Sequence, residues 1–255
     1  VCPSLSLAKG QAIVELGCGN CHLGGAKTNP FAGQIPNLID AGGRYTSAFL
    51  HRVLQNGQAR RRKGAAGRMP VFHLSEGERS ALVGYLKTRT VTMPNEMNGL
   101  VKPIDLGNQT AVERGRQAFT EYGCSGCHAV DGVGGDVGPK LDGIAAKLKP
   151  KWVEAYLIDP KRIDPSTSMV NLFYERRGQR YQSLHRDKDV AADLASLIAY
   201  LYRQAPIEDS QQDDSSVATG ERVFNSLRCA NCHQLKKPTQ FAPELAQISN
   251  RFTDA

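Results

Sequence analysis

Six of the seven cysteines in this 255-residue chain form three pairs, each spaced C-x-x-C and followed at once by a histidine. The motifs comprise Cys18, Cys21 and His22; Cys124, Cys127 and His128; and Cys229, Cys232 and His233. Such a pair can be half of a structural zinc site or a redox dithiol. It can also attach a c-type haem, whose iron the adjacent histidine then ligates.

An internal repeat sets the three motifs in register. KGQAIVELGCGNCH, RGRQAFTEYGCSGCH and TGERVFNSLRCANCH align, and Gly10, Gly115 and Gly220 recur every 105 residues. A zinc site needs four ligands, usually from two nearby pairs, whereas these pairs lie in separate repeats. A dithiol centre does not need the histidine. The repeat therefore predicts three covalently attached haem c groups, with the motif histidines as iron ligands.

Two methionines are candidates for the sixth ligand of the iron. Met69 and Met169 lie at similar distances after the motif histidines of the first two repeats, before the last helix that the pattern predicts in each. A methionine thioether raises the reduction potential and suits electron transfer. His73 and His185 are the alternative ligands. No comparable ligand is evident after His233.

Helices are expected to position these motifs. The segment DVAADLASLIAYLYRQ, residues 189–204, places five apolar residues on one helical face. Thr110 with Glu113, and Ser75 with Glu78, have the spacing of capping boxes at helix starts. No segment shows the alternation typical of a strand. We therefore expect an all-α fold of tandem domains, each a few helices wrapped around one covalently bound haem.

The repeat and two polar linkers suggest five segments. We expect module 1 at residues 1–92, a linker at 93–108, module 2 at 109–205, an acidic linker at 206–216 and module 3 at 217–255. Far fewer residues follow the motif histidine in the third repeat than in the other two. Module 3 is therefore expected to be incomplete, with a native chain that continues beyond residue 255.

The formal net charge of +7 is concentrated in residues 1–106, around ARRRKG at 59–64. This cluster predicts that module 1 docks an acidic surface of a redox partner, although a solvated loop is the alternative. No aromatic residues are interleaved with the arginines, so nucleic acid is not an expected partner. No window reaches the roughly 18 apolar residues of a transmembrane segment, so none is expected. Covalent haem attachment implies a periplasmic or otherwise exported protein.

The repeats resemble class I cytochrome c in three tandem copies. The resemblance implies that a glycine and an aromatic residue of the first helix pack against a leucine and an aromatic residue of the last. The matching residues are Gly10 and Val14 with Leu82 and Tyr85, Gly115 and Phe119 with Leu197 and Tyr200, and Gly220 and Phe224 in module 3. It also implies that the carbonyls of Pro36, Pro139 and Pro243 accept the Nδ1–H of the haem histidines.

The resemblance implies a relay of single electrons between redox proteins. The chain would act as a carrier, or as a subunit or arm of a larger, membrane-associated respiratory oxidoreductase, and not as an enzyme itself. A peroxidase-like multihaem enzyme with an open haem in module 3 is the alternative, because His233 has no evident opposite ligand.

Overall fold

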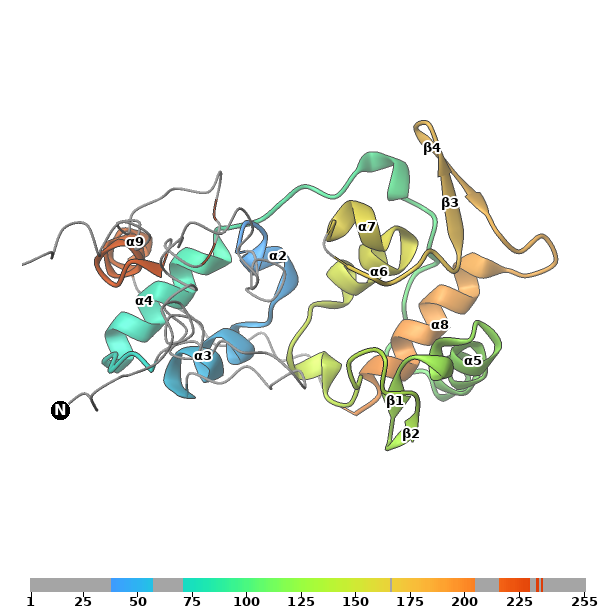
Figure 1. The fold of residues 1–255 in the computed structure, drawn as a ribbon, viewed down its shortest axis with the longest axis horizontal. Helices are drawn as coiled ribbons and strands as arrows, with labels where there is room; N and C mark the ends of the chain where they lie inside the picture. Colours follow the sequence, from blue (N-terminus) through green and yellow to red (C-terminus); the bar gives the residue numbers. More distant parts are fainter. Residues whose placement is uncertain are drawn as a thin grey trace, which may run out of the picture. The chain divides into compact units, whose positions relative to one another are not determined.

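The computed structural model describes residues 38–56, 71–165, 167–204, 216–229, 233 and 235. This part of the chain forms two compact units (Figure 1). The first unit contains the described residues of 38–41, 50–89 and 216–235, and the second contains residues 42–49 and the described residues of 90–204. The start of the expected module 3 thus lies in the same unit as the end of the expected module 1.

The second unit is built around one buried helix. Its helical elements are η2 (Asn95–Met97), α5 (Gln109–Glu121), η3 (Cys124–Gly126), η4 (Ile144–Ala146), α6 (Pro150–Ile158), α7 (Pro160–Ile163) and α8 (Val190–Tyr202). Helix α8 contacts α5, α6 and η4, and its five predicted core residues are all buried. The predicted apolar face of residues 189–204 is thus confirmed, although most of the rest of α8 is buried as well.

Helices α5 and α8 cross at a glycine. A Cβ atom on Gly115 would lie 1.9 Å from the carbonyl oxygen of Ser196 and 2.7 Å from the Cβ of Tyr200. Only glycine allows the two backbones to approach this closely. The rings of Phe119 and Tyr200 then pack beside the crossing, with centroids 5.9 Å apart. The expected contact of Gly115 and Phe119 with the last helix of module 2 is confirmed.

Two short antiparallel hairpins correct the expectation of a purely all-α fold. Strands β1 (Ala129–Val130) and β2 (Val133–Gly134) pair, as do β3 (Tyr174–Arg177) and β4 (Arg180–Ser183). Positive φ angles at Asp131 and Gly132 fit a type I′ turn, which favours Asp-Gly. Gly178, with φ of 63°, opens the two-residue loop of the second hairpin. Both turns are short sequence signals that apolar periodicity does not detect.

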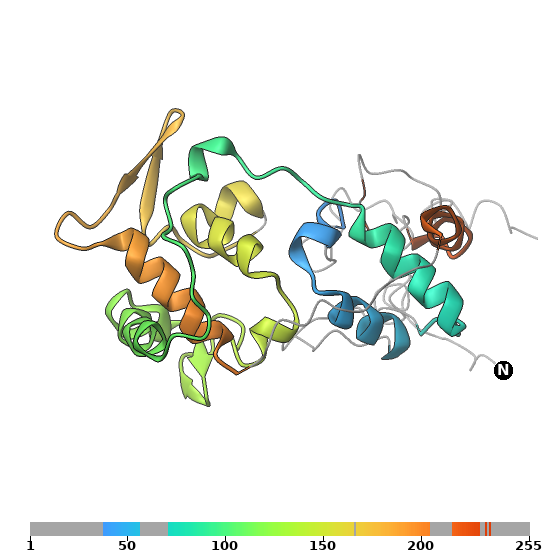
Figure 2. The ribbon, with the colours of Figure 1, turned by 180° about the vertical axis from the view of Figure 1, so that it is seen from behind.

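Polar contacts near the turn of the second hairpin hold it against the junction of α6 and α7. The hydroxyl of Tyr181, on β4, donates to Oδ2 of Asp159 at 3.1 Å, and Arg176 of β3 forms an ion pair with the same carboxylate. Asp159 also caps α7 by accepting from the backbone N–H of Arg162. Figures 1 and 2 both show this hairpin, formed by β3 and β4, projecting from the helices of the second unit.

Residues 42–49 pack within the second unit. They include the end of α2 (Ala41–Arg44) and the start of α3 (Ser47–Asn56). Tyr45 forms an isolated antiparallel bridge with Leu148, and the hydroxyl of Thr46 donates to the carbonyl of Ala146 at 3.0 Å. The guanidinium of Arg44 lies 4.4 Å from the ring centroid of Trp152. Aromatic and backbone contacts therefore hold this segment of the first repeat beside α6.

The first unit contains α4 (Glu76–Lys87) and α9 (Val217–Ser226), which pack against each other. The predicted capping box at the start of α4 is confirmed, because Ser75 Oγ accepts from Glu78 N and Glu78 accepts from Ser75 N. The other predicted capping box is wrong. Helix α5 begins earlier than predicted, and the side chain of Asn108 caps it by accepting from Ala111 N at 3.1 Å.

Candidate functional site

The C-x-x-C-H motif of module 2 is a tight turn directly after α5. Gly123 adopts a left-handed conformation with φ of 74°, which ends the helix and starts the 3-10 turn η3. The backbone N–H groups of Cys127 and His128 both donate to the carbonyl of Cys124, at 3.2 and 2.9 Å. The turn buries Cys124, leaves Cys127 exposed and places His128 at the surface of the unit, half-buried.

The imidazole of His128 is oriented by a proline carbonyl. Its Nδ1 lies 2.7 Å from the carbonyl oxygen of Pro139. A carbonyl oxygen only accepts hydrogen bonds, so Nδ1 carries the proton and Nε2 keeps its lone pair. This is the tautomer that a metal-ligating histidine needs, and the hydrogen bond also fixes the orientation of the ring.

A glycine-rich loop, residues 132–138, lies against the motif. Gly135 N donates to the carbonyl of Ser125 at 2.8 Å, and Gly138 N donates to that of Cys127 at 2.7 Å. A Cβ atom on Gly138 would lie 2.4 Å from Cε1 of His128. The loop therefore reaches the imidazole only because Gly138 has no side chain. The glycines before Pro139 are dense in the sequence, but their spacing alone does not indicate this role.

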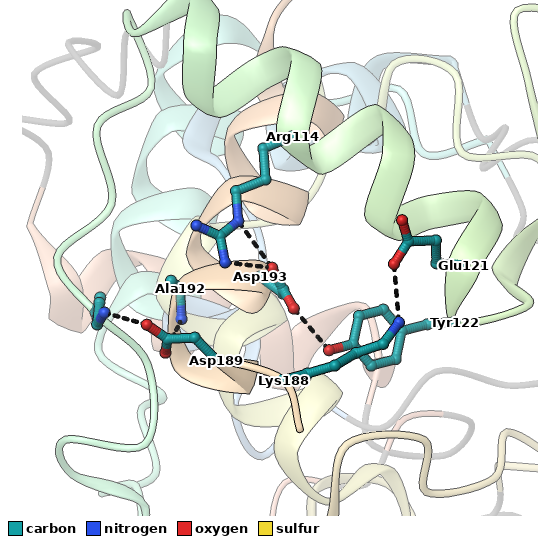
Figure 3. A network of polar contacts seen from close by, with 8 residues as sticks. Arg114, Glu121, Tyr122, Lys188, Asp189, Ala192 and Asp193 are labelled. Atoms are coloured by element: carbon teal, nitrogen blue, oxygen red, sulfur yellow. Dashed lines mark hydrogen bonds and ion pairs between the residues drawn. The ribbon is translucent and has the colours of Figure 1, made fainter. Parts of the chain in front are cut away.

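A polar network fixes the start of the motif to α8 (Figure 3). The hydroxyl of Tyr122 donates to Oδ2 of Asp193 at 2.8 Å, and Arg114 forms an ion pair with the same carboxylate at 2.7 Å. Lys188 lies 4.6 Å from the Tyr122 ring centroid and pairs with Glu121 at 2.8 Å. Burial, together with the hydrogen bond to Asp193, raises the pKa of Tyr122. The residue before Gly123 is thereby held at both its ring and its hydroxyl, a role that spacing alone did not indicate.

The buried thiols favour covalent attachment over dithiol chemistry. Burial raises the pKa of Cys124 to about 11, and that of Cys229 also to about 11. A redox dithiol needs a lowered pKa, because the thiolate is its reactive form. Among the described residues, no group of three or more histidines, cysteines and carboxylates has the arrangement of a metal site. Two thiols and one imidazole nitrogen on one turn fit the attachment of a haem.

The described part of the third motif repeats this geometry. Cys229 follows α9, is buried, and accepts a hydrogen bond from the backbone N–H of His233 at 2.9 Å. The residue before it, Arg228, is left-handed with φ of 55°, as Gly123 is before Cys124. Cys232 and Pro243 lie outside the described residues. The local fold of the second motif therefore recurs where the third motif can be described.

Several predicted ligands of the first motif also fall outside the described residues. These are Cys18, Cys21, His22, Pro36 and Met69, together with the basic cluster at 59–64. Their assignments stay predictions.

Met169, the proposed sixth ligand of module 2, is half-buried. Its backbone N–H donates to the hydroxyl of Thr167 at 3.1 Å, which orders the chain beside it. The rival ligand His185 is already engaged in packing, since its Nε2 lies 2.8 Å from the carbonyl of Leu172 and its ring packs edge-on against Tyr122. These contacts favour Met169 over His185.

A helical domain that presents two thiols and one free imidazole nitrogen on a single turn is the arrangement of a protein that carries covalent haem. The sequence model described as Cytochrome c matches residues 7–90 and 112–203. The chain therefore belongs to the cytochrome c family, with tandem modules, and the expected family is confirmed.

The chain is also similar to the subunit CcoP of cbb3-type cytochrome c oxidase from two strains of Helicobacter pylori. Both are 27% identical to it over 128 residues, which is 49% of this chain and 38% or 37% of the relative. The chain thus aligns with well under half the length of these curated relatives. No solved structure matches it significantly. No helix in the described part of the chain is long and apolar enough to cross a membrane.

Proposed function

We propose that the chain relays single electrons through three covalently attached haem c groups, one at each C-x-x-C-H motif. The orientation of His128 carries this proposal: the carbonyl of Pro139 accepts a hydrogen bond from Nδ1–H, which leaves Nε2 as the nitrogen that could ligate iron. Haem supplies an iron that gains and loses one electron. Cys124 and Cys127 would hold the macrocycle, while Gly138 lets the loop approach the ligating ring.

A methionine ligand would suit each of these haem sites to electron transfer instead of catalysis. Met169 in module 2 and Met69 in module 1 are the proposed ligands. A thioether ligand raises the reduction potential of the iron and occupies the position that a substrate would need. The alternative, a peroxidase-like haem in module 3, requires one iron with an open position.

The similarity to an oxidase subunit suggests where the electrons go. The relatives are named as subunits of a cbb3-type cytochrome c oxidase. We infer that this chain is likewise a haem-bearing part of a larger, membrane-associated respiratory complex, on the extracytoplasmic side. It would accept electrons from one redox protein and pass them to another.

Haem counting and ligand replacement test the proposal on the full-length holoprotein. We expect three covalent haems per chain, and two in the double variant Cys124→Ala, Cys127→Ala. In Met169→Ala, one haem should lose its methionine-ligated spectrum, acquire a lower reduction potential and bind carbon monoxide in the ferrous state. Val170→Ala is the control, because Val170 is the exposed neighbour of Met169. An unchanged haem spectrum in Met169→Ala would exclude this ligand.

The unmodified holoprotein separates a relay from an enzyme. We expect its methionine-ligated ferrous haems to resist carbon monoxide and its ferric haems to turn over no peroxide. Rapid carbon monoxide binding by one haem of the complete chain, with peroxide turnover, would instead establish the peroxidase-like alternative.

A further inference from the structure

Helix α4 of the first repeat packs against α9 of the third. A Cβ atom on Gly220 of α9 would lie 1.9 Å from the carbonyl oxygen of Ala81 and 2.7 Å from the Cβ of Tyr85. The Phe224 ring packs on the Tyr85 ring with centroids 5.5 Å apart, and Phe224 is only 1% exposed. Figures 1 and 2 show the two helices side by side from opposite directions.

This crossing reproduces the one between α5 and α8. There, the two corresponding distances at Gly115 are also 1.9 and 2.7 Å. The interplanar angle between Phe119 and Tyr200 is 54°, against 51° between Phe224 and Tyr85. In the repeat, Gly220 corresponds to Gly115 and Phe224 to Phe119. Helix α9 therefore occupies on α4 the place that α5 occupies on α8, which is the place of the first helix of a domain on its last.

The sequence contains two candidates for this place on α4. The expected partner was the segment with Gly10 and Val14, which lies outside the described residues. Helix α9 offers the same glycine but a phenylalanine where the first repeat has Val14. A phenylalanine fills the space beside Tyr85 with more apolar surface and adds an aromatic pair. The crossing has room for one helix, since Gly220 lies directly against the backbone of α4.

We propose that the third C-x-x-C-H motif belongs to a composite domain, in which α9 leads into the motif and α4 of the first repeat serves as the last helix. The buried turn at Cys229 starts three residues after the end of α9, so the contact with α4 positions this turn. A haem attached there would depend on a helix that the repeat assigns to the first module. The pairing is independent of the electron-transfer proposal, since it rests on helix packing.

Photo-cross-linking from α9 tests the composite domain in the native full-length holoprotein. Glu221 follows Gly220, is exposed, and lies close enough to Tyr85 to affect its pKa. A benzophenone amino acid at position 221 should cross-link to the peptide that contains residues 76–87. The matched control is the same probe at Arg116, which follows Gly115 and should cross-link to residues 190–202.

Two outcomes would overturn the proposal. One is a cross-link from position 221 to any segment other than α4, including a segment beyond residue 255. The other is a cross-link to α4 of a second chain, which a mixture of ¹⁴N- and ¹⁵N-labelled protein reveals by mass. Neither outcome bears on whether the haems carry electrons.

Hydrogen exchange gives an independent measurement. Tyr85→Ala should speed exchange of the α9 amides about tenfold and leave α5 unchanged, because it removes the aromatic partner of α9 alone. Tyr200→Ala should speed exchange in α5 and leave α9 unchanged. Equal protection of α9 in Tyr85→Ala and the parent protein would contradict the composite domain.

Discussion

At Gly138 the absence of one side chain makes room for the imidazole of His128. A Cβ there would lie 2.4 Å from Cε1 and 2.6 Å from Nδ1. Because the loop is bound to the carbonyl of Cys127, it has little freedom to retreat. We expect Gly138→Ala to lower the free energy of unfolding by about 2 kcal/mol, the usual scale of overpacking, and to disturb the haem spectrum. Thermal unfolding monitored at the haem absorbance measures both effects.

Gly77→Ala is the control for this prediction. Gly77 lies in the first turn of α4, and nothing lies within 4 Å of a Cβ placed on it. This variant should be as stable as the parent protein or slightly more stable, since alanine favours a helix. A normal haem spectrum in Gly138→Ala would show that the ring does not need this space.

Arg228 holds a backbone conformation that costs energy for any residue with a Cβ. Its φ is 55°, whereas the equivalent Gly123 takes the same conformation freely. We expect Arg228→Gly to raise the free energy of unfolding by ~1 kcal/mol, since it relieves the left-handed strain. Calorimetry of the holoprotein would detect this as a higher melting temperature.

The reciprocal variant tests the same explanation. Gly123→Ala should destabilise the second motif by a similar amount, because φ there is 74°. If Arg228→Gly leaves the melting temperature unchanged while Gly123→Ala lowers it, the left-handed backbone of Arg228 does not destabilise the folded protein.

At the scale of elements, the Tyr122–Asp193 contact joins the end of α5 to α8. Burial and Asp193 raise the pKa of Tyr122, so the folded state favours the neutral phenol. This contribution to stability is complete below the ordinary pKa of about 10 and is lost as the pH rises above it. In Tyr122→Phe we expect about 1 kcal/mol less stability at neutral pH and a shallower decline above pH ~10.

Denaturant titrations between pH 7 and pH ~12 measure this effect. Asp193→Asn is the companion variant, because it keeps a hydrogen-bond acceptor but removes the negative charge that disfavours the phenolate. Its decline above pH ~10 should lie between those of the parent protein and Tyr122→Phe. Parallel curves for all three proteins would show that Tyr122 does not titrate in this range.

The helices near the motifs were predictable because their signals are local. The apolar face of α8 and the capping box at Ser75 follow from spacing along one segment, and both are confirmed. The hairpins were missed because their signals are confined to two-residue turns such as Asp131–Gly132. The pairing of α4 with α9 could not be predicted from the sequence for another reason. The repeat offers two equivalent glycine segments, around Gly10 and Gly220, and the sequence alone does not distinguish between them.

Part of the candidate site was likewise predictable from the sequence and part was not. The motif cysteines and histidines follow from spacing, whereas the roles of Gly138 and Tyr122 depend on chain folding back onto the motif. Asp193 reaches Tyr122 from 71 residues further along the chain. Contacts between residues so far apart in the chain produce no periodic pattern in the sequence from which they could be predicted.

For the whole molecule, the uneven charge predicts how partners approach. The cluster at 59–64 lies outside the described residues, so its docking role stays a prediction. We expect electron transfer with an acidic redox protein to slow as ionic strength rises, because salt screens the attraction. The triple variant Arg60→Gln, Arg61→Gln, Arg62→Gln should reduce the rate at low salt roughly tenfold and flatten its salt dependence. Stopped-flow mixing over a salt series measures both.

Two arginines outside the cluster at 59–64 provide the control for this prediction. Arg180 and Arg186 are exposed residues of the second unit, so the double variant Arg180→Gln, Arg186→Gln removes two positive charges that do not belong to the cluster. This double variant should retain most of the electron-transfer rate at low salt, and the rate should still fall as the ionic strength rises. An equal loss in both variants would assign the effect to total charge instead of a docking surface.

The contact between α4 and α9 also affects when the protein can finish folding. About 130 residues separate Lys87 from Val217, and the second unit lies almost entirely between them. The entropic cost of closing a loop grows only slowly with its length, so this separation is tolerable at equilibrium. During synthesis, however, α4 emerges long before its partner, whereas α5 and α8 can pair as soon as residue 202 is available. The second unit should therefore fold first, and the face of α4 that contacts α9 should stay uncovered until residues 217–226 have been synthesised.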